Sequence, residues 1–183
     1  MFFKKKETTI PVVAVDFSKI SWSQFLKDYR NLNGWPDTQE EKTKLAAELA
    51  EIYDKIQLPQ RQTAGSAGYD FYLPQSVTIG KTAVTIPTGI TARIPQGYFL
   101  ALVPRSSLGF KFGVRLANTV GIIDSDYFFA DNEGHIMCRM LADKQCKLNA
   151  GDRFVQGIVI PYAVGVDSPV NQERNGGMGS TGK

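Results

Sequence analysis

The chain has 183 residues, of which 43% are hydrophobic and 21% are charged, a composition typical of one globular domain spanning residues 1–183. A formal net charge of only +3 does not indicate a nucleic-acid-binding surface, so we expect no stable nucleic-acid partner. No segment has the pattern of a signal peptide or a membrane span, and two cysteines, predicted to be reduced thiols, are typical of a cytoplasmic protein with no membrane contact.

The N-terminal third of the chain predicts one short strand and two helices. Residues 9–15 form a β-rich run, in which Pro11 favours an edge position. Residues 20–57 predict a helical hairpin, because apolar side chains recur there at helical spacing after Ser21 and again after Thr38. This hairpin is either a packed appendage or a docking surface for a protein partner.

From residue 67 onward the pattern changes to short β-branched and aromatic runs separated by Gly, Pro and Asn. This pattern predicts an all-β sandwich, jelly roll or barrel. The predicted strands are 69–73, 84–86, 90–94, 99–103, 114–116, 136–141 and 154–162. The last segment, residues 172–183, contains four glycines and almost no apolar side chain, and it predicts a flexible C-terminal arm.

Five short segments carry most of the chemistry-bearing residues. They are Ala-Gly-Tyr-Asp at 67–70, Pro-Arg-Ser-Ser-Leu-Gly at 104–109, Asn-Thr-Val-Gly-Ile-Ile-Asp-Ser-Asp-Tyr at 118–127, Gly-Asp-Arg-Phe-Val-Gln at 151–156 and Arg-Asn-Gly-Gly-Met-Gly-Ser-Thr-Gly at 174–182. In their order and separations, these segments closely resemble the five motifs of the trimeric dUTPase family.

The resemblance implies a dUTPase-like jelly roll or distorted β-barrel, with the helical hairpin inserted near its N-terminus. It also implies hydrolysis of dUTP to dUMP and pyrophosphate with Mg²⁺, which keeps uracil out of DNA and supplies dUMP for dTMP synthesis. The family is homotrimeric, and its C-terminal arm crosses to a neighbouring subunit, so each site would draw on three chains.

Asp124 is the expected catalytic residue. From the residues alone, 118–127 could be an Asp-rich surface turn, or a hairpin around Gly121 followed by Asp124 and Asp126 on one face of a strand. The resemblance places Asp124 behind the α-phosphorus, where it would hold and deprotonate the attacking water. Since an ordinary aspartate is a weak base, most of the acceleration should come from positioning and charge neutralisation.

The remaining roles divide between the phosphates, the metal and the nucleoside. The resemblance assigns phosphate contacts to Arg105, Ser106, Ser107, Gln156, Arg174, Gly179, Ser180 and Thr181, Mg²⁺ binding through water to Asp70, and nucleoside contacts to Asn118, Gly121, Ile123, Tyr127 and Met178. Each also has an ordinary structural interpretation. Asp70 could stabilise a turn, Tyr127 could be a core tyrosine, and Asp152 with Arg153 could form a structural ion pair after a turn.

The chain departs from the family pattern at two places near the site. Met178 stands where an aromatic residue is common, which predicts weaker closure over the base. Residues 128–133 are an apparent insertion, either reshaping the site or forming a harmless bulge.

Two other functions remain open from the sequence. A dCTP deaminase shares the fold and the Arg-Ser-Ser segment, but Arg139 stands where its catalytic glutamate is expected. A regulatory module would use the same fold and its nucleotide to control a protein partner. The single histidine, His135, excludes a metal site built from several histidines of one chain.

Overall fold

The computed structural model describes residues 13–166, which begin with a short strand and two helices. Strand β1 spans Asp16–Lys19, helix α1 spans Trp22–Asn33 and helix α2 spans Gln39–Asp54. Both helices start at the predicted caps: the hydroxyl of Ser21 accepts a hydrogen bond from the N–H of Gln24, and Thr38 does the same for Glu41. Within the described part of the chain, no helix is long and apolar enough to cross a membrane.

The rest of the described chain is rich in strands, as the sequence predicts. The elements are β2 (Gly68–Tyr72), β3 (Val77–Ile79), β4 (Val84–Pro87), β5 (Ile90–Arg93), β6 (Tyr98–Pro104), α3 (Ser106–Phe112), β7 (Arg115–Leu116), β8 (Gly121–Ile123), the 3₁₀ helix η1 (Ser125–Phe129), β9 (Met137–Leu141), β10 (Cys146–Leu148) and β11 (Arg153–Pro161). All seven strands predicted from residue 67 onward are therefore confirmed to within about two residues at each end.

The strands pair into four small sheets within residues 13–166. Their orders are β1-β5, β10-β3, β2-β11-β6-β8 and β4-β9-β7, and every pairing is antiparallel. Strand β11 is one of the two inner strands of the largest sheet, because it pairs with β2 along one edge and with β6 along the other. Non-polar residues from all the sheets form one core, in which Phe71, Leu100, Ile136 and Phe154 are fully buried.

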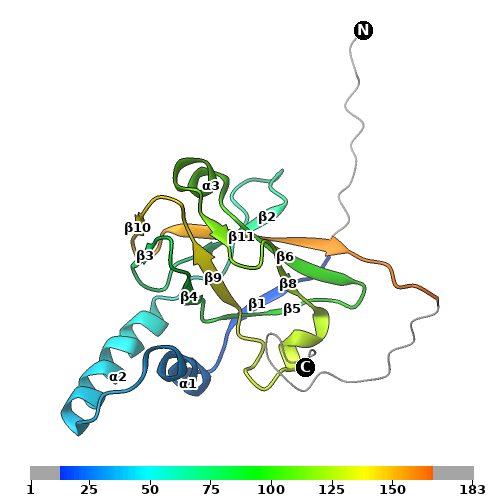
Figure 1. Cartoon of the computed structure of the whole chain (residues 1–183). Helices are drawn as coiled ribbons and strands as arrows, with labels where there is room; N and C mark the ends of the chain where they lie inside the picture. The colour runs from blue at the N-terminus through cyan, green and yellow to red at the C-terminus, as the bar shows by residue number, and fades with distance from the viewer. Residues whose placement is uncertain (1–12, 167–183) are drawn as a thin grey trace.

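Helices α1 and α2 lie together at one end of the strands (Figure 1). Their aromatic side chains point inward: Trp22 packs on Phe25 and on Tyr53, with ring centroids 6.1 and 5.4 Å apart. Phe25 and Leu49 are almost fully buried and belong to the same core as the strands. Helices α1 and α2 therefore share one hydrophobic core with the strands.

Three local predictions differ from the structure. The turn falls at 117–120, where Thr119 has a φ of 71°, and Gly121 instead begins strand β8, which pairs with β6. Asp124 and Asp126 do not share a strand, because the chain enters η1 directly after Asp124. Residues 106–112 form helix α3, which the sequence pattern did not indicate.

Candidate functional site

The first cluster of predicted site residues lies where β2, β6 and β11 meet. Asp70 pairs with Gln156 across the β2–β11 ladder. Its Oδ2 accepts a hydrogen bond from Nη1 of Arg153 at 2.9 Å, and its Oδ1 lies 4.0 Å from Nε of Arg105. Gln156 packs closely against Gly68, where an added Cβ would lie 2.6 Å from the side-chain oxygen of Gln156 and 3.3 Å from its Cβ. Asp70, Arg105 and Gln156 are thus brought together as the motifs predict.

Ser106 and Ser107 follow directly on this cluster. Arg105 adopts an extended conformation as the N-cap of α3, and both serines are exposed in the first turn. The first N–H groups of a helix have no partner within it, so this turn presents hydroxyl and backbone donors beside a guanidinium. Such a set suits the oxygens of a polyphosphate.

The second cluster lines a cavity of about 660 Å³ between β6, β8 and β9. Asn118, Gly121 and Ile123 all contribute to its wall. Gly121 packs closely here, because an added Cβ would lie 3.0 Å from Cβ of Leu102 on the neighbouring strand. Cys138 also lines the cavity, and burial raises the pKa of its thiol to about 12, so this thiol stays protonated at neutral pH.

Asp124 and Tyr127 occupy very different environments. Asp124 is exposed at the N-cap of η1, whereas Tyr127 is only 2% exposed. The hydroxyl of Tyr127 donates to the carbonyl of His135 at 2.9 Å and accepts from Nδ2 of Asn132 at 3.0 Å. These contacts are those of a core tyrosine; they leave the proposed contact with a deoxyribose as a prediction.

A single chain does not bring Asp124 to the phosphate cluster. Leu100 pairs with Ile123 in the β6–β8 ladder, so Asp124 lies level with Phe99. Arg105 stands six residues further along, beyond the other end of β6. At about 3.3 Å per residue, the two side chains are separated by roughly 20 Å along the strand.

The predictions for Arg174, Met178, Gly179, Ser180 and Thr181 fall outside the described residues. Of the β-rich run predicted at residues 9–15, only 13–15 are described; they form no strand, and β1 begins at Asp16 instead. Among residues 13–166, no three His, Cys, Asp or Glu side chains gather in a way that could hold a metal ion.

The predicted ion pair between Asp152 and Arg153 is wrong, because each of these side chains has a different partner. Arg153 pairs with Asp70, 83 residues away, while the carboxylate of Asp152 accepts from the N–H of Asn149 and stabilises the turn. Sequence reasoning therefore missed Arg153 as a neighbour of the site. The local sequence around Arg153 carries no signal of this contact, which follows from the pairing of β11 with β2.

Comparison with known proteins agrees with these motifs. The dUTPase family model matches residues 54–182. The deoxyuridine 5'-triphosphate nucleotidohydrolase of Lactococcus lactis is 40% identical over 133 residues, which cover 69% of this chain and 89% of that protein. The Wolinella succinogenes protein of the same name is 34% identical over 151 residues, covering 78% and 98%.

Solved structures show the same relationship. The dUTPase from Streptococcus mutans superposes with a TM-score of 0.57 at 33% identity, covering 83% of this chain and 98% of that one. A dUTPase from phage phi11 of Staphylococcus aureus, at 20% identity and a TM-score of 0.52, shares the fold. The family match over most of the chain and the identity to its relatives lead to one conclusion: the chain belongs to the dUTPase family.

Proposed function

We propose that this protein hydrolyses dUTP to dUMP and pyrophosphate, and so keeps uracil out of DNA and supplies dUMP for dTMP synthesis. The observation that carries this proposal is the match of residues 54–182 to the dUTPase family, together with relatives named for dUTP hydrolysis. Arg139, an exposed arginine on β9, stands where a dCTP deaminase would need a carboxylate, which argues against that alternative.

Asp124 is proposed as the catalytic residue. Asp124 is exposed at the N-cap of η1, so solvent and a substrate can reach it. Hydrolysis needs a water aimed at the α-phosphorus opposite the leaving pyrophosphate, and a carboxylate can orient that water and accept its proton. No covalent intermediate is required by this scheme.

The phosphate side of the site is proposed to form around Arg105. Its guanidinium, the hydroxyls of Ser106 and Ser107, and the amide of Gln156 would neutralise and orient the triphosphate. Arg174 and the donors of Gly179, Ser180 and Thr181 would complete it from the C-terminal arm.

Magnesium is proposed to bind beside Asp70. Carboxylate oxygens suit this hard cation, which keeps several of its waters and is commonly shared with substrate phosphates. Although Oδ2 of Asp70 accepts from Arg153, its Oδ1 is 4.0 Å from Arg105, beyond hydrogen-bond distance. That oxygen retains the capacity to accept from a metal-bound water. Bound magnesium would supply charge neutralisation to the triphosphate.

The uracil is proposed to bind at the cavity lined by Asn118, Gly121 and Ile123. An amide side chain and main-chain groups can match the acceptor–donor–acceptor edge of uracil, and cytosine would leave a donor unmatched. Tyr127 would pack beneath the deoxyribose and Met178 over the base.

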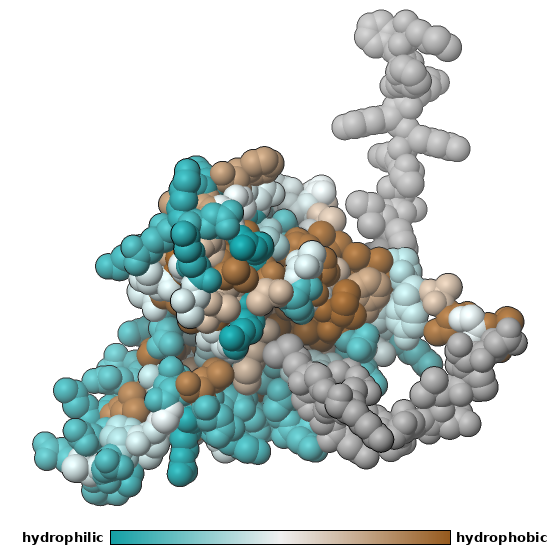
Figure 2. All heavy atoms as spheres, in the orientation of Figure 1, coloured by the Kyte–Doolittle hydropathy of each residue, from teal (hydrophilic) through white to brown (hydrophobic). Residues whose placement is uncertain are grey.

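The assembly is proposed to be a homotrimer with shared sites. Because Asp124 and Arg105 lie roughly 20 Å apart along β6, a second copy of the chain must supply one of them to a common substrate. Ile122 is 53% exposed and Val120 is 37% exposed, although both are apolar residues at or beside β8. Figure 2 shows a hydrophobic area over β6 and β8, which a neighbouring subunit would cover.

The remaining features are proposed as follows. The four sheets would form the jelly roll or distorted barrel of the family, as one domain over residues 1–183 with the arm at 172–183. Residues 20–57 would be an insertion into that fold, because the family match begins at residue 54, after nearly all of α1 and α2. The free thiols of Cys138 and Cys146 fit a cytoplasmic location.

Subunit complementation tests this proposal. Asp124→Asn and Arg105→Ala should each abolish pyrophosphate release from dUTP, while the control Arg115→Ala, which removes an exposed guanidinium paired with Asp143, should not. When the two inactive variants are mixed and allowed to exchange, roughly a quarter of the sites should receive both intact residues, so about a quarter of the activity should return.

The control for complementation is direct evidence of exchange. Differently tagged copies of the two variants should co-purify after mixing. If the copies co-purify and no activity returns, the shared site is refuted.

A further inference from the structure

One tyrosine, Tyr127, forms hydrogen bonds with both ends of the segment 124–135. The N–H of Tyr127 donates to the carbonyl of Asp124 at 3.2 Å, and the hydroxyl of Tyr127 donates to the carbonyl of His135 at 2.9 Å. The ring of Tyr127 therefore links the start of the 124–135 segment to its end.

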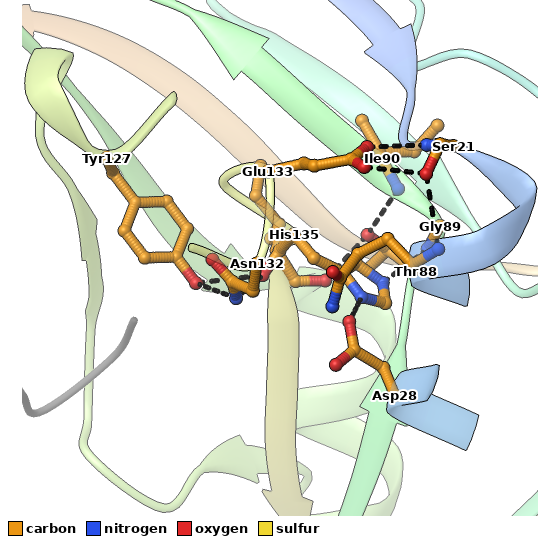
Figure 3. Close-up of polar contacts among 11 residues, drawn as sticks. Ser21, Asp28, Thr88, Gly89, Ile90, Tyr127, Asn132, Glu133 and His135 are labelled. Carbon is orange, nitrogen blue, oxygen red and sulfur yellow. Dashed lines mark hydrogen bonds and ion pairs between the residues drawn. The ribbon is translucent and has the colours of Figure 1, made fainter. Parts of the chain in front are cut away.

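The end of this segment is also bound to helix α1, as Figure 3 shows. The carboxylate of Glu133 accepts hydrogen bonds from the N–H and the hydroxyl of Ser21, both at 2.6 Å. Nδ1 of His135 lies 2.7 Å from Oδ2 of Asp28. Ser21 is the N-cap of α1 and Asp28 lies in its middle, so two points of one helix hold the segment.

The backbone sets the protonation of His135. Its Nε2 accepts a hydrogen bond from the N–H of Gly89 at 2.9 Å, so this nitrogen carries no proton. Nδ1 is therefore the nitrogen that carries the proton, and it donates to Asp28. His135 is fully buried and Asp28 is 6% exposed. A buried hydrogen bond to a carboxylate is strong, and losing one partner leaves the other unsatisfied.

The state of Asp28 agrees with this arrangement. Burial alone would raise the pKa of Asp28, but the hydrogen bond from His135 and the positive charge of Lys27 act against it, and the pKa lies below its usual value. The carboxylate is therefore ionised at neutral pH.

Glu133 is held with a φ of 57°, a left-handed conformation that a non-glycine residue keeps only when its surroundings enforce it.

We propose that Asp28, Glu133 and His135 are positioning residues for the hydrolysis of dUTP, acting through Tyr127 on Asp124. In this view, helix α1 is part of the machinery that places the catalytic carboxylate, rather than a separate appendage. We call the contacts of Asp28 with His135 and of Ser21 with Glu133 the anchor. The inference rests on the proposed role of Asp124, so the Asp124→Asn variant is measured beside every variant of the anchor.

The test compares variants that break the anchor with one that keeps its geometry. Asp28→Ala removes the acceptor of His135, whereas Asp28→Asn keeps an oxygen there. Glu133→Gln replaces one of the two oxygens that bind Ser21, and because Glu133 is exposed this change should leave the protein folded. Glu51→Ala is the matched control, since it removes a carboxylate from an exposed ion pair with Lys55 on helix α2.

Steady-state rates are measured with dUTP, normalised to the concentration of folded sites, well below the unfolding temperature of each variant. A misplacement of about 1 Å in a reacting group costs up to roughly 100-fold, so kcat of Asp28→Ala and Glu133→Gln should fall about 10- to 100-fold with KM nearly unchanged. Asp28→Asn should recover most of the lost kcat, and Glu51→Ala should match the wild type.

The inference is overturned if folded Asp28→Ala or folded Glu133→Gln keeps a kcat within about twofold of the wild type. A merely structural role would lower stability without slowing the folded enzyme. If Asp28→Ala does not fold, Glu133→Gln alone decides the question. An active Asp124→Asn variant would instead refute the proposed catalytic residue, an outcome distinguishable from failure of the anchor.

Discussion

Gly134 offers the sharpest single-residue test of how the segment after Asp124 is packed. Its φ is +65°, in the left-handed region that favours glycine. A Cβ added at this position would lie 2.7 Å from the carbonyl oxygen of Tyr127 and 2.8 Å from Cα of Phe128. Both contacts are with backbone, which cannot rotate away as a flexible side chain can. Gly134→Ala must therefore displace the segment that carries Tyr127.

The cost has two parts. A left-handed conformation costs a non-glycine residue about 1–2 kcal/mol. Overpacking a filled site costs about 1–3 kcal/mol more, so the free energy of unfolding should fall by roughly 2–5 kcal/mol. For a chain of this size each kcal/mol lowers Tm by about 2–4 °C, so the Tm of Gly134→Ala should fall by roughly 4–20 °C.

Two further glycines distinguish the conformational cost from the overpacking cost. Gly97 has a φ of +88° but nothing within 4 Å of an added Cβ, so Gly97→Ala pays only the conformational cost. Gly80 has neither a positive φ nor a close neighbour, so Gly80→Ala should be close to neutral. Thermal and urea unfolding of the three variants gives the order Gly134, Gly97, Gly80. If Gly134→Ala loses no more stability than Gly97→Ala, the packing described for this segment is refuted.

Three other predictions follow from the described contacts and the sequence. Because the pKa of Asp28 is lowered from 3.8, its ionised form contributes stability above that value and loses it as the pH falls through the lower folded pKa. The stability difference between wild type and Asp28→Asn in urea should therefore shrink below about pH 4, and a constant difference would contradict this. Cys138 and Cys146 are each 1% exposed, and burial raises the pKa of both thiols. Neither should therefore react with a thiol reagent until the protein unfolds. Rapid reaction of the folded protein would contradict their burial. Met178→Phe should lower KM for dUTP by about two- to tenfold, since an aromatic stack adds about 0.5–1.5 kcal/mol, and unchanged KM and kcat would remove the proposed contact with the base.

Local signals in the sequence predicted helices α1 and α2 and most of the longer strands, but not the short strands β3 and β10. The caps Ser21 and Thr38 and the stop at Gly34, which has a φ of 78°, follow rules that involve only neighbouring residues. The strands were found by composition and turn signals, and the five motifs identified the family. Helix α3 was missed because its seven residues include Gly109 and two aromatic residues, which are poor helix formers in a segment this short.

Long-range contacts could not be predicted in the same way. His135 and Asp28 are 107 residues apart, and Arg153 and Asp70 are 83 apart. Nothing in the local pattern of either pair indicates its partner, because burial and strand pairing decide which charges meet. The same limit applies to the separation of Asp124 from Arg105, which follows from the β6–β8 register.

The central claim is that this protein releases pyrophosphate from dUTP by means of Asp124. The most direct measurement is pyrophosphate release with magnesium from dUTP, dCTP, dTTP and UTP, for the wild type and for Asp124→Asn. We predict release from dUTP alone, and its loss in the variant. Absence of release from dUTP by folded wild-type protein, or full activity of Asp124→Asn, would contradict the account.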